Sequence, residues 1–229
     1  MSRKYLVAAA LALTVGSAQA QTIKIGFVDP LSGPFANVGE QGLRGFQLVV
    51  EEINARGGAN GQKFELVALD SKANPQEALN ALKQLTDQGV RYVMQGNSSA
   101  VAAALSDGVA KHNRRNPKST ILFLNYAAVD PALTNERCNF WHFRFDADAD
   151  MKMQALTNYM AQQKKIQKVY LINQDYAFGQ AVSKSAREML AKKRPDIKIV
   201  GDDLHPLGKV KDFAPYIAKI KASGADSVV

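Results

Sequence analysis

The sequence predicts an α/β fold in which parallel sheets are sandwiched by helices. Short apolar runs typical of strands alternate along the chain with longer segments whose apolar residues recur every three or four positions. Gly, Pro and Asn stand between the two kinds of segment, as they do at turns and helix ends. Strands that are joined through helices pair in parallel, and both faces of such a sheet become buried.

The first predicted unit, residues 22–70, consists of a strand, a loop, a helix, a turn and a second strand. Its first strand is Ile23–Val28, and its helix ends at 56–58, where an arginine precedes two glycines. The residues expected on the buried face of this helix are Leu43, Phe46, Val50 and Ile53. In an open sheet of this kind, ligands bind at the carboxyl ends of the strands.

The second predicted unit begins with a helix that Asn74 caps, that has Pro75 in its first turn and that ends at Gly89. The residues expected on its buried face are Ala78, Leu82 and Leu85. The elements expected next are the strand Arg91–Met94, a turn at 96–99, the helix Ala100–Lys111, the strand Thr120–Leu124, a loop at 125–137 and the aromatic strand Phe140–Phe145.

A polar segment at 146–150 interrupts this pattern, and the alternation of strands and helices then starts again. The elements expected there are a helix at 150–164, the strand Lys168–Asn173, a helix ending at Lys193, the strand Ile197–Val200, the helix Asp212–Ala222 and the start of a strand at 225–229. Their expected buried residues are Met153, Leu156, Met160, Val182, Ala186, Met189, Leu190, Phe213, Ile217 and Ile220. We therefore divide the chain into a first lobe at 21–145 and a second, incomplete lobe at 146–229.

The first twenty residues have the pattern of a cleavable signal peptide. Arg3 and Lys4 precede the apolar run Leu6–Val15, and the small residues of Ala18-Gln19-Ala20 follow it. That run is too short to span a bilayer, and no later stretch is long and apolar enough. The sequence therefore predicts an exported protein of the bacterial periplasm, whose mature chain starts at Gln21.

Charge and cysteine content exclude some classes of protein. Removal of Arg3 and Lys4 with the signal peptide lowers the formal charge from +8 to +6. The remaining basic residues are scattered, and the densest runs, at 111–115 and 192–194, lie near expected helix C-termini, where cations offset the helix dipole. This favours solvated faces over a nucleic-acid site, although an anionic ligand or partner stays open. Cys138 is the only cysteine, so no disulfide can form within this chain.

Ser98 and Ser99 are the sharpest candidates for chemistry. They follow a predicted parallel strand and precede a helix, so two hydroxyls and the free amides of the helix start come together. Such a position suits a carboxylate. The alternative is that a serine only caps its own helix.

Other motifs fail. Asp146, Asp148 and Asp150 imitate the start of a calcium loop, but Met151 takes its glycine position and Thr157 the position of its bidentate glutamate. We interpret this cluster as a solvated helix start. The histidines have no metal-ligand spacing, the glycines at 39, 42 and 45 form no dinucleotide motif, and no catalytic constellation is recognisable. The sequence therefore predicts no metal, no cofactor and no catalytic residue.

A family resemblance emerges from the segment SGPFANVGEQGLRGFQLVVEEINARGGANGQKFELVALDSKANPQEA, residues 32–78. It resembles the opening of type I periplasmic binding proteins, and above all the branched-chain amino acid (Leu/Ile/Val) receptors of ABC importers. The resemblance covers nearly the whole mature chain. It implies two α/β lobes that close over a small solute, a membrane permease as partner, a monomer and no enzymatic activity.

The resemblance also implies roles for single residues. Ser99 matches a serine that holds the ligand carboxylate, and Phe178 matches an aromatic residue that contacts the ligand side chain. The other implied or nearby contacts are Ser98, Tyr126, Ala127, Ala128 and Tyr176. Val129 stands where the family has a threonine and Val38 where it has an aromatic residue, so the identity of the solute stays open.

The expected function is therefore capture and delivery of a small carboxylate-bearing solute, either a branched-chain amino acid or a related or aromatic acid. Two alternatives from other classes stay open. One is a ligand-sensing domain of a receptor or regulator on the same fold, and the other is a periplasmic enzyme.

Overall fold

The computed structural model describes residues 22–229, and the predicted signal peptide at 1–20 lies outside the described residues. The strands are β1 (Ile23–Asp29), β2 (Phe64–Asp70), β3 (Tyr92–Gln95), β4 (Leu122–Asn125), β5 (His142–Arg144), β6 (Lys168–Gln174), β7 (Lys198–His205) and β8 (Ser227–Val228). The α-helices are α2 (Ala36–Ala55), α3 (Pro75–Asp87), α4 (Ser99–Arg115), α5 (Ala149–Gln162), α6 (Ala177–Lys193) and α7 (Ala214–Ser223). Short 3-10 helices are η1 (Gly33–Phe35), η2 (Pro117–Ser119) and η3 (Pro131–Thr134).

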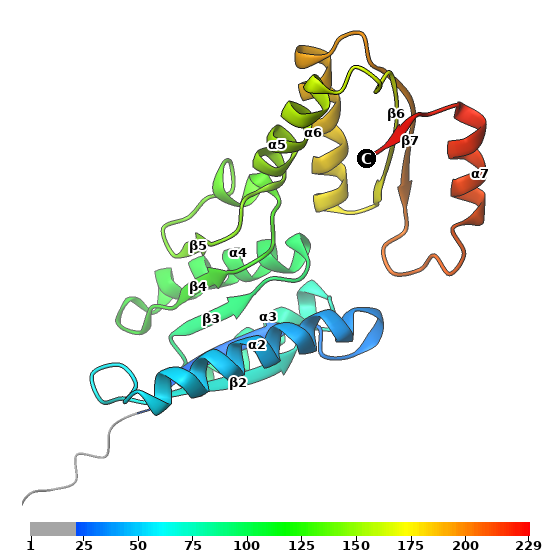
Figure 1. Ribbon diagram of the computed structural model, residues 1–229. Coiled ribbons are helices and arrows are strands. Elements are labelled where there is room, and N and C mark those ends of the chain that lie inside the picture. The colour runs from blue at the N-terminus through cyan, green and yellow to red at the C-terminus, as the bar shows by residue number, and fades with distance from the viewer. Residues whose placement is uncertain (1–21) are drawn as a thin grey trace, which may run out of the picture.

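The first five strands form one parallel sheet in the order β2-β1-β3-β4-β5. Helix α2 crosses one face of this sheet, and α3 and α4 pack side by side on the other (Figure 1). A core cluster that includes Val28, Leu85, Val93 and Phe123 fills the space between this sheet and α3 and α4. The predicted α/β class is confirmed for this part of the chain.

The last three strands form a second parallel sheet in the order β7-β6-β8. Helices α5 and α6 pack against each other on one side of it, and α7 lies on the other side beside β7 (Figure 1). This sheet has its own core cluster, which includes Met153, Val169, Leu171 and Leu190. The two sheets thus have separate cores, and the division of the chain near Phe145 stays a proposal.

The predicted helix faces are only partly correct. Ala78, Leu82 and Leu85 of α3 are buried as expected, but Ile53 of α2 and Leu156 of α5 are each 39% exposed. Asn54 turns toward β2 in place of Ile53, and its side chain bonds to the backbone of Phe64. In α5 the fully buried Thr157 takes the inward place of Leu156, because its hydroxyl can donate to the carbonyl of Met153 at 2.7 Å.

Helix α7 is the most exposed of the expected amphipathic helices. Phe213 and Ile217, expected to be buried, are 41% and 49% exposed. The half-buried residues of α7 are Tyr216, Ile220 and Ser223, and the ring of Tyr216 contacts that of His205 on β7. Of the predicted stripe, only Ile220 is half-buried, and Tyr216 faces the sheet in place of Ile217.

The predicted aromatic strand at 140–145 is shorter than expected. Strand β5 contains only His142–Arg144, and Phe140, Phe143 and Phe145 are exposed. The buried residue is His142, whose ring stacks on Phe123 at 5.0 Å between centroids. Strand β5 lies at the edge of its sheet and pairs only with β4.

The acidic cluster is not the solvated helix start that the sequence suggests. Asp148 is 6% exposed, caps α5 by accepting from the amide of Met151 at 2.8 Å, and pairs with the buried Arg144 at 2.7 Å. Arg144 also donates to the carbonyl of Asp130 at 3.0 Å. The cluster thus anchors the crossing between the two sheets. Within residues 22–229, no group of three or more His, Cys, Asp or Glu side chains is placed to hold a metal ion.

Arg194, in the basic run at 192–194, is also not solvated. Its guanidinium donates to the carbonyls of Met160, Gln163 and Ile166 at the end of α5, and it pairs with Asp196 at 2.7 Å. In the described part of the chain, no helix combines the length and the apolar character that a membrane crossing requires.

Candidate functional site

The carboxyl ends of neighbouring strands lie together at one edge of the first sheet. Asp29 at the end of β1 is in register with Asp70 at the end of β2, and Gln95 at the end of β3 with Asn125 at the end of β4. The loops that leave these strands therefore meet at one place, as the general rule for ligand sites in open α/β sheets requires.

Ser98 is the N-cap of α4 and has an unusual backbone conformation. Its φ of +81° lies in a region that residues with a side chain seldom adopt. Its hydroxyl accepts a hydrogen bond from the amide of Val101 at 3.4 Å. The buried Gln95 donates from its side chain to the carbonyls of Asn97 and Ser98, which holds the turn in this shape.

The adjacent Ser99 has a different environment. It is the first residue of α4, it is 2% exposed, and its hydroxyl accepts from the backbone amide of Asp130 at 3.3 Å. The two serines therefore do not present their hydroxyls side by side. Ser98 caps its own helix, which is the alternative left open above, and it also lines the cavity described below.

The loop after β4 is fixed by Asn125, which the sequence analysis did not single out. The side chain of Asn125 accepts from the amides of Ala127 at 3.2 Å and Ala128 at 2.7 Å, and it donates to the carbonyl of Ala128 at 2.8 Å. Asn125 is fully buried and Ala128 is 2% exposed. These bonds already satisfy the backbone amides of Ala127 and Ala128, two residues at which the resemblance implies ligand contacts.

Tyr126, in the same loop, packs inward. Its ring stacks on Phe27 at 6.1 Å and meets the edge of Phe46 at 5.0 Å. Its hydroxyl donates to the carboxylate of Asp29. Burial, and then the charge of Asp29 and this bond, raise the pKa of Tyr126 far above its ordinary value, so the hydroxyl keeps its proton at neutral pH.

Asp29 is a second buried residue that the sequence analysis missed. Its side chain is fully buried, and its carboxylate also accepts from the amides of Gly96 at 3.3 Å and Asn97 at 2.9 Å. Burial raises the pKa of Asp29 to about 6, although its hydrogen bonds from Tyr126, Asn97 and Gly96 act in the opposite direction. Its only signal in the sequence is an acidic residue at the end of an apolar strand.

The second sheet contributes an aromatic pair. Tyr176 and Phe178 follow β6, and their rings lie 6.0 Å apart. Burial raises the pKa of Tyr176 above its ordinary value. Both side chains are half-buried, so they are neither core residues nor free surface residues.

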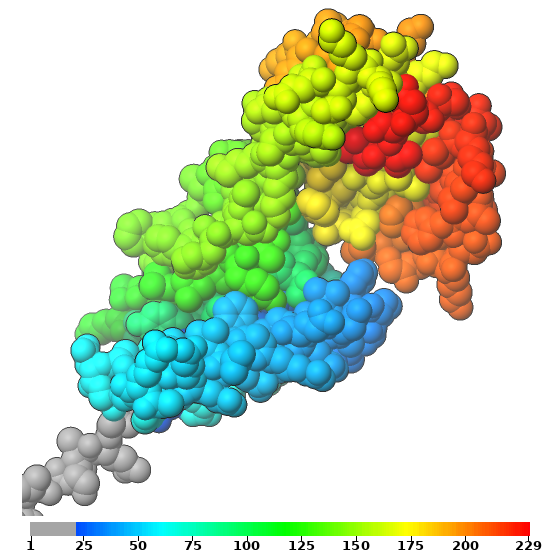
Figure 2. Space-filling model, in the orientation of Figure 1, coloured from blue at the N-terminus to red at the C-terminus, as the bar shows by residue number. Residues whose placement is uncertain are grey.

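A cavity of about 240 Å³ lies between these two strand-end regions. Figure 2 shows a hollow there, between the blue start of α2 and the yellow and orange segments after β6 and β7. The lining residues are Phe35, Val38, Ala73, Asn97, Ser98, Gln174, Tyr176 and Leu207. Of the candidates from the sequence, Ser98 and Tyr176 line it, whereas Ser99, Tyr126, Ala127, Ala128 and Phe178 do not.

The cavity can hold a small molecule through hydrogen bonds and apolar contacts. Its volume is below the roughly 300–1,000 Å³ of sites for drug-sized ligands, so it suits a smaller solute. Asn97, Ser98, Gln174 and Tyr176 supply polar groups. No charged side chain of residues 22–229 lines the cavity. An anionic group there would be surrounded by polar groups and would not be repelled by a carboxylate.

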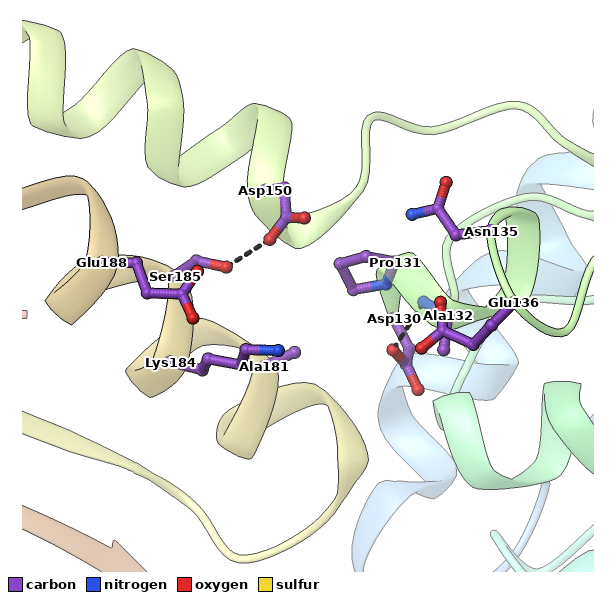
Figure 3. A pocket seen from close by; sticks show the side chains of 10 residues that line it. All are labelled: Asp130, Pro131, Ala132, Asn135, Glu136, Asp150, Ala181, Lys184, Ser185 and Glu188. Atoms are coloured by element: carbon purple, nitrogen blue, oxygen red, sulfur yellow. Dashed lines mark hydrogen bonds between the residues drawn. The ribbon is translucent and has the colours of Figure 1, made fainter.

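A second cavity, also of about 240 Å³, lies where η3 of the first part faces α6 of the second part (Figure 3). Its charged lining residues are Asp130, Glu136, Asp150, Glu188 and Lys184. The hydroxyl of Ser185 donates to Asp150 from the same wall. Four carboxylates against one ammonium group would repel an anionic solute, so we place the candidate site at the Ser98 and Tyr176 cavity.

Comparison with known proteins shows the family of the chain. A family model described as a periplasmic binding protein matches residues 22–229. The chain is 34% identical over 222 residues to Leu/Ile/Val-binding protein homolog 4 of Brucella abortus (strain 2308), which covers 96% of the chain and 53% of that protein.

Two solved structures have the same arrangement. The leucine-, isoleucine-, valine-, threonine- and alanine-binding protein of Brucella ovis, in a closed conformation, matches with a TM-score of 0.78 and 33% identity over 91% of the chain and 53% of that protein. A solute binding protein of an ABC transporter from Rhodopseudomonas palustris BisB5, in complex with 3,4-dihydroxybenzoic acid, matches with a TM-score of 0.77 and 22% identity, over 90% of the chain and 53% of that protein. At that identity the second match shows the fold alone. The chain spans about half the length of each of these relatives.

Proposed function

Since the chain belongs to the periplasmic binding protein family, we propose that it captures a small carboxylate-bearing solute and delivers it to an ABC importer. The solute class is a branched-chain amino acid or a related or aromatic acid. The observation that carries this proposal is the cavity between the two strand-end regions, with Ser98 on one wall and Tyr176 on the other.

Capture would proceed by closure of the two parts over the solute. In this scheme the solute carboxylate accepts hydrogen bonds at the start of α4, where helix amides and the hydroxyl of Ser98 converge. Tyr176 then covers it from the second part. Ser99, Ala127, Ala128 and Phe178 are proposed to contact the solute in the closed form, and Tyr126 is proposed to contribute from behind the wall, through its hydrogen bonds. The solute favours closure because it makes the second set of contacts only when the parts are closed.

The proposal also covers the location of the protein, its partner and the type of its activity. The pattern of residues 1–20 supports export to the periplasm through a signal peptide. There the closed monomer would dock on a membrane permease. The proposed activity is binding and release, with no chemical change of the solute, and the relatives whose names describe binding proteins support this.

A thermal-shift screen of the complete protein tests the proposal. L-leucine, L-isoleucine, L-valine, benzoate and 4-hydroxybenzoate form the panel, and neutral sugars serve as controls. A carboxylate at 100 times its Kd should stabilise the protein by about 2.7 kcal/mol, because it binds the folded state only. A response to sugars alone, with none to any carboxylate, would contradict the proposed solute class.

Serine variants locate the solute once a binder is found. Ser99→Ala and Ser98→Ala should each weaken binding by roughly 1–3 kcal/mol, since each leaves a polar group without its partner. Calorimetry measures the change. Ser223→Ala, in the last turn of α7, is the matched control and should leave the affinity unchanged. Unchanged affinity in Ser99→Ala would remove that residue from the site.

A further inference from the structure

A buried carboxylate lies directly behind the turn that forms the first wall of the cavity. One oxygen of Asp29 accepts from the amides of Gly96 at 3.3 Å and Asn97 at 2.9 Å, and the other accepts from the hydroxyl of Tyr126. These two amides immediately precede Ser98. Asp29 thus reaches the cavity wall through the backbone, although its own side chain is fully buried.

Tyr126 contacts the same turn in two further ways. The side-chain amide of Asn97 donates to its hydroxyl at 3.3 Å. Its ring lies so close to Gly96 that a Cβ atom at that position would collide with it. The ring is itself held by Phe27 and Phe46. The hydroxyl of Tyr126 therefore links the carboxylate, the turn and the aromatic cluster.

Two features of this network, the buried carboxylate of Asp29 and the backbone of Ser98, each lower the stability of the folded protein. A buried carboxylate is destabilising unless its hydrogen bonds compensate, and a positive φ at a serine is strained. Both features converge on the four residues 96–99. Strained backbone persists only where the surrounding structure holds it in place, and it is found most often at binding and catalytic sites.

We propose that Asp29 and Tyr126 are positioning residues, which hold Asn97 and Ser98 in the conformation that receives the solute. This inference rests on the proposed function, since it assigns the machinery behind the same site. Neither side chain lines the cavity, so both act through the turn and not by touching the solute.

Two variants of the complete protein test the inference. Tyr126→Phe keeps the ring and removes the hydroxyl, and Asp29→Asn keeps the shape and removes the charge. Tyr159→Phe, on an exposed tyrosine of α5, is the matched control. L-leucine and benzoate are the probes. For a probe that the wild type binds, Tyr126→Phe should lose roughly tenfold in affinity, as expected for a lost hydrogen bond to a charged group. The control should lose none.

The pH profile separates positioning from general stability. Tyr126 is the titratable side chain that contacts Asp29, and it stays protonated across the range. The wild-type affinity should fall as pH drops from 8 to 5, because protonation of the carboxylate weakens its hold on the turn. Asp29→Asn should bind equally at both values. A wild-type profile that matches that of Asp29→Asn would overturn the inference.

Amide hydrogen exchange gives a readout that needs no solute. Removal of the Tyr126 hydroxyl should speed exchange at Gly96 and Asn97 by roughly tenfold, while amides of β2 and α3 keep their wild-type rates. Equal rates in wild type and Tyr126→Phe would refute the positioning role, whether or not a probe binds. If the wild type binds neither probe, the proposed solute class fails, and the exchange rates still decide this inference.

Discussion

At the scale of single residues, two asparagines join helices to the strands that follow them. Asn113 of α4 donates to the carbonyl of Ile121 and accepts from its amide, both at 2.8 Å. Asn54 of α2 makes the same pair of bonds with Phe64, also at 2.8 Å each. An asparagine amide can satisfy both backbone groups of one residue because it carries a donor and an acceptor side by side.

Asn113→Ala should lower the free energy of unfolding by roughly 1–3 kcal/mol, since Asn113 is 2% exposed and both backbone groups of Ile121 lose their partner. Urea denaturation should show a lower midpoint with the same slope. Asn80→Ala, on the exposed face of α3, is the matched control and should change little. Equal effects of the two substitutions would show that the paired bonds of Asn113 contribute no stability.

Asp29 also predicts a pH dependence of stability. Its pKa in the folded protein is about 6, against 3.8 for an ordinary aspartate, so the folded state binds more protons than the unfolded state between these values. Stability should therefore fall as pH rises from about 4 to 6 and level off above, by about 3 kcal/mol from this residue.

Asp29→Asn removes that titration, so it should be more stable than wild type at pH 7, and the difference should shrink toward pH 4. Denaturation at a series of pH values measures it. A constant difference between the two proteins across this range would contradict the raised pKa.

At the scale of elements, the start of α2 depends on one glycine. A Cβ atom at Gly39 would collide with the carbonyl oxygen of Pro30, whereas at Gly45 it would meet nothing within 4 Å. Gly42 is intermediate, because its Cβ would lie 2.9 Å from the hydroxyl of Tyr126. The close approach of Gly39 keeps the loop after β1, and with it Phe35, against the helix.

Gly39→Ala should therefore destabilise the protein by at least about 1–3 kcal/mol, the range for overpacking. Gly45→Ala is the matched control in the same helix. It should stabilise by roughly 0.5–1 kcal/mol, because alanine has the higher helix propensity and the site is open. Melting temperatures that move in opposite directions would support this reading. A stable Gly39→Ala protein would contradict the close contact with Pro30.

The elements also show what sequence patterns can and cannot predict. Within residues 22–229, the alternation of strands and helices predicts every strand and α-helix, because each kind of element has its own apolar period. The inward stripe fails at Leu156, where buried Thr157 satisfies its hydroxyl on its own helix. It also fails at Ile217, where the half-buried Tyr216 faces the sheet in its place. The spacing of Gly39, Gly42 and Gly45 cannot reveal that only some of them have close neighbours.

At the scale of the whole molecule, the crossing between the two sheets is fixed by polar contacts. Arg144 at the end of β5 pairs with Asp148 at the start of α5, and the amide of Ala149 donates to the carbonyl of Val129 at 2.9 Å. These contacts tie the loop that follows β4 to the first helix of the second part. Hinge closure would have to occur around this anchored crossing.

The site itself is a property of this whole arrangement. The strand-end rule and the resemblance lead to Ser98 and Tyr176, which both line the cavity. Gln174 and Leu207 escape notice because only the meeting of the two parts brings them to it. Asp29 and Asn125 escape notice because their partners are backbone amides of loops, which no sequence pattern specifies. Asp29 accepts from Asn97, 68 residues further along the chain, and Asn125 accepts from Ala128, three residues further.

A crystal structure of the complete protein with the solute that raises its melting temperature most is the decisive measurement. We predict electron density for the solute between Ser98 and Tyr176, with its carboxylate at the start of α4. Density in the acidic cavity beside Lys184, or outside both cavities, would contradict the proposed site.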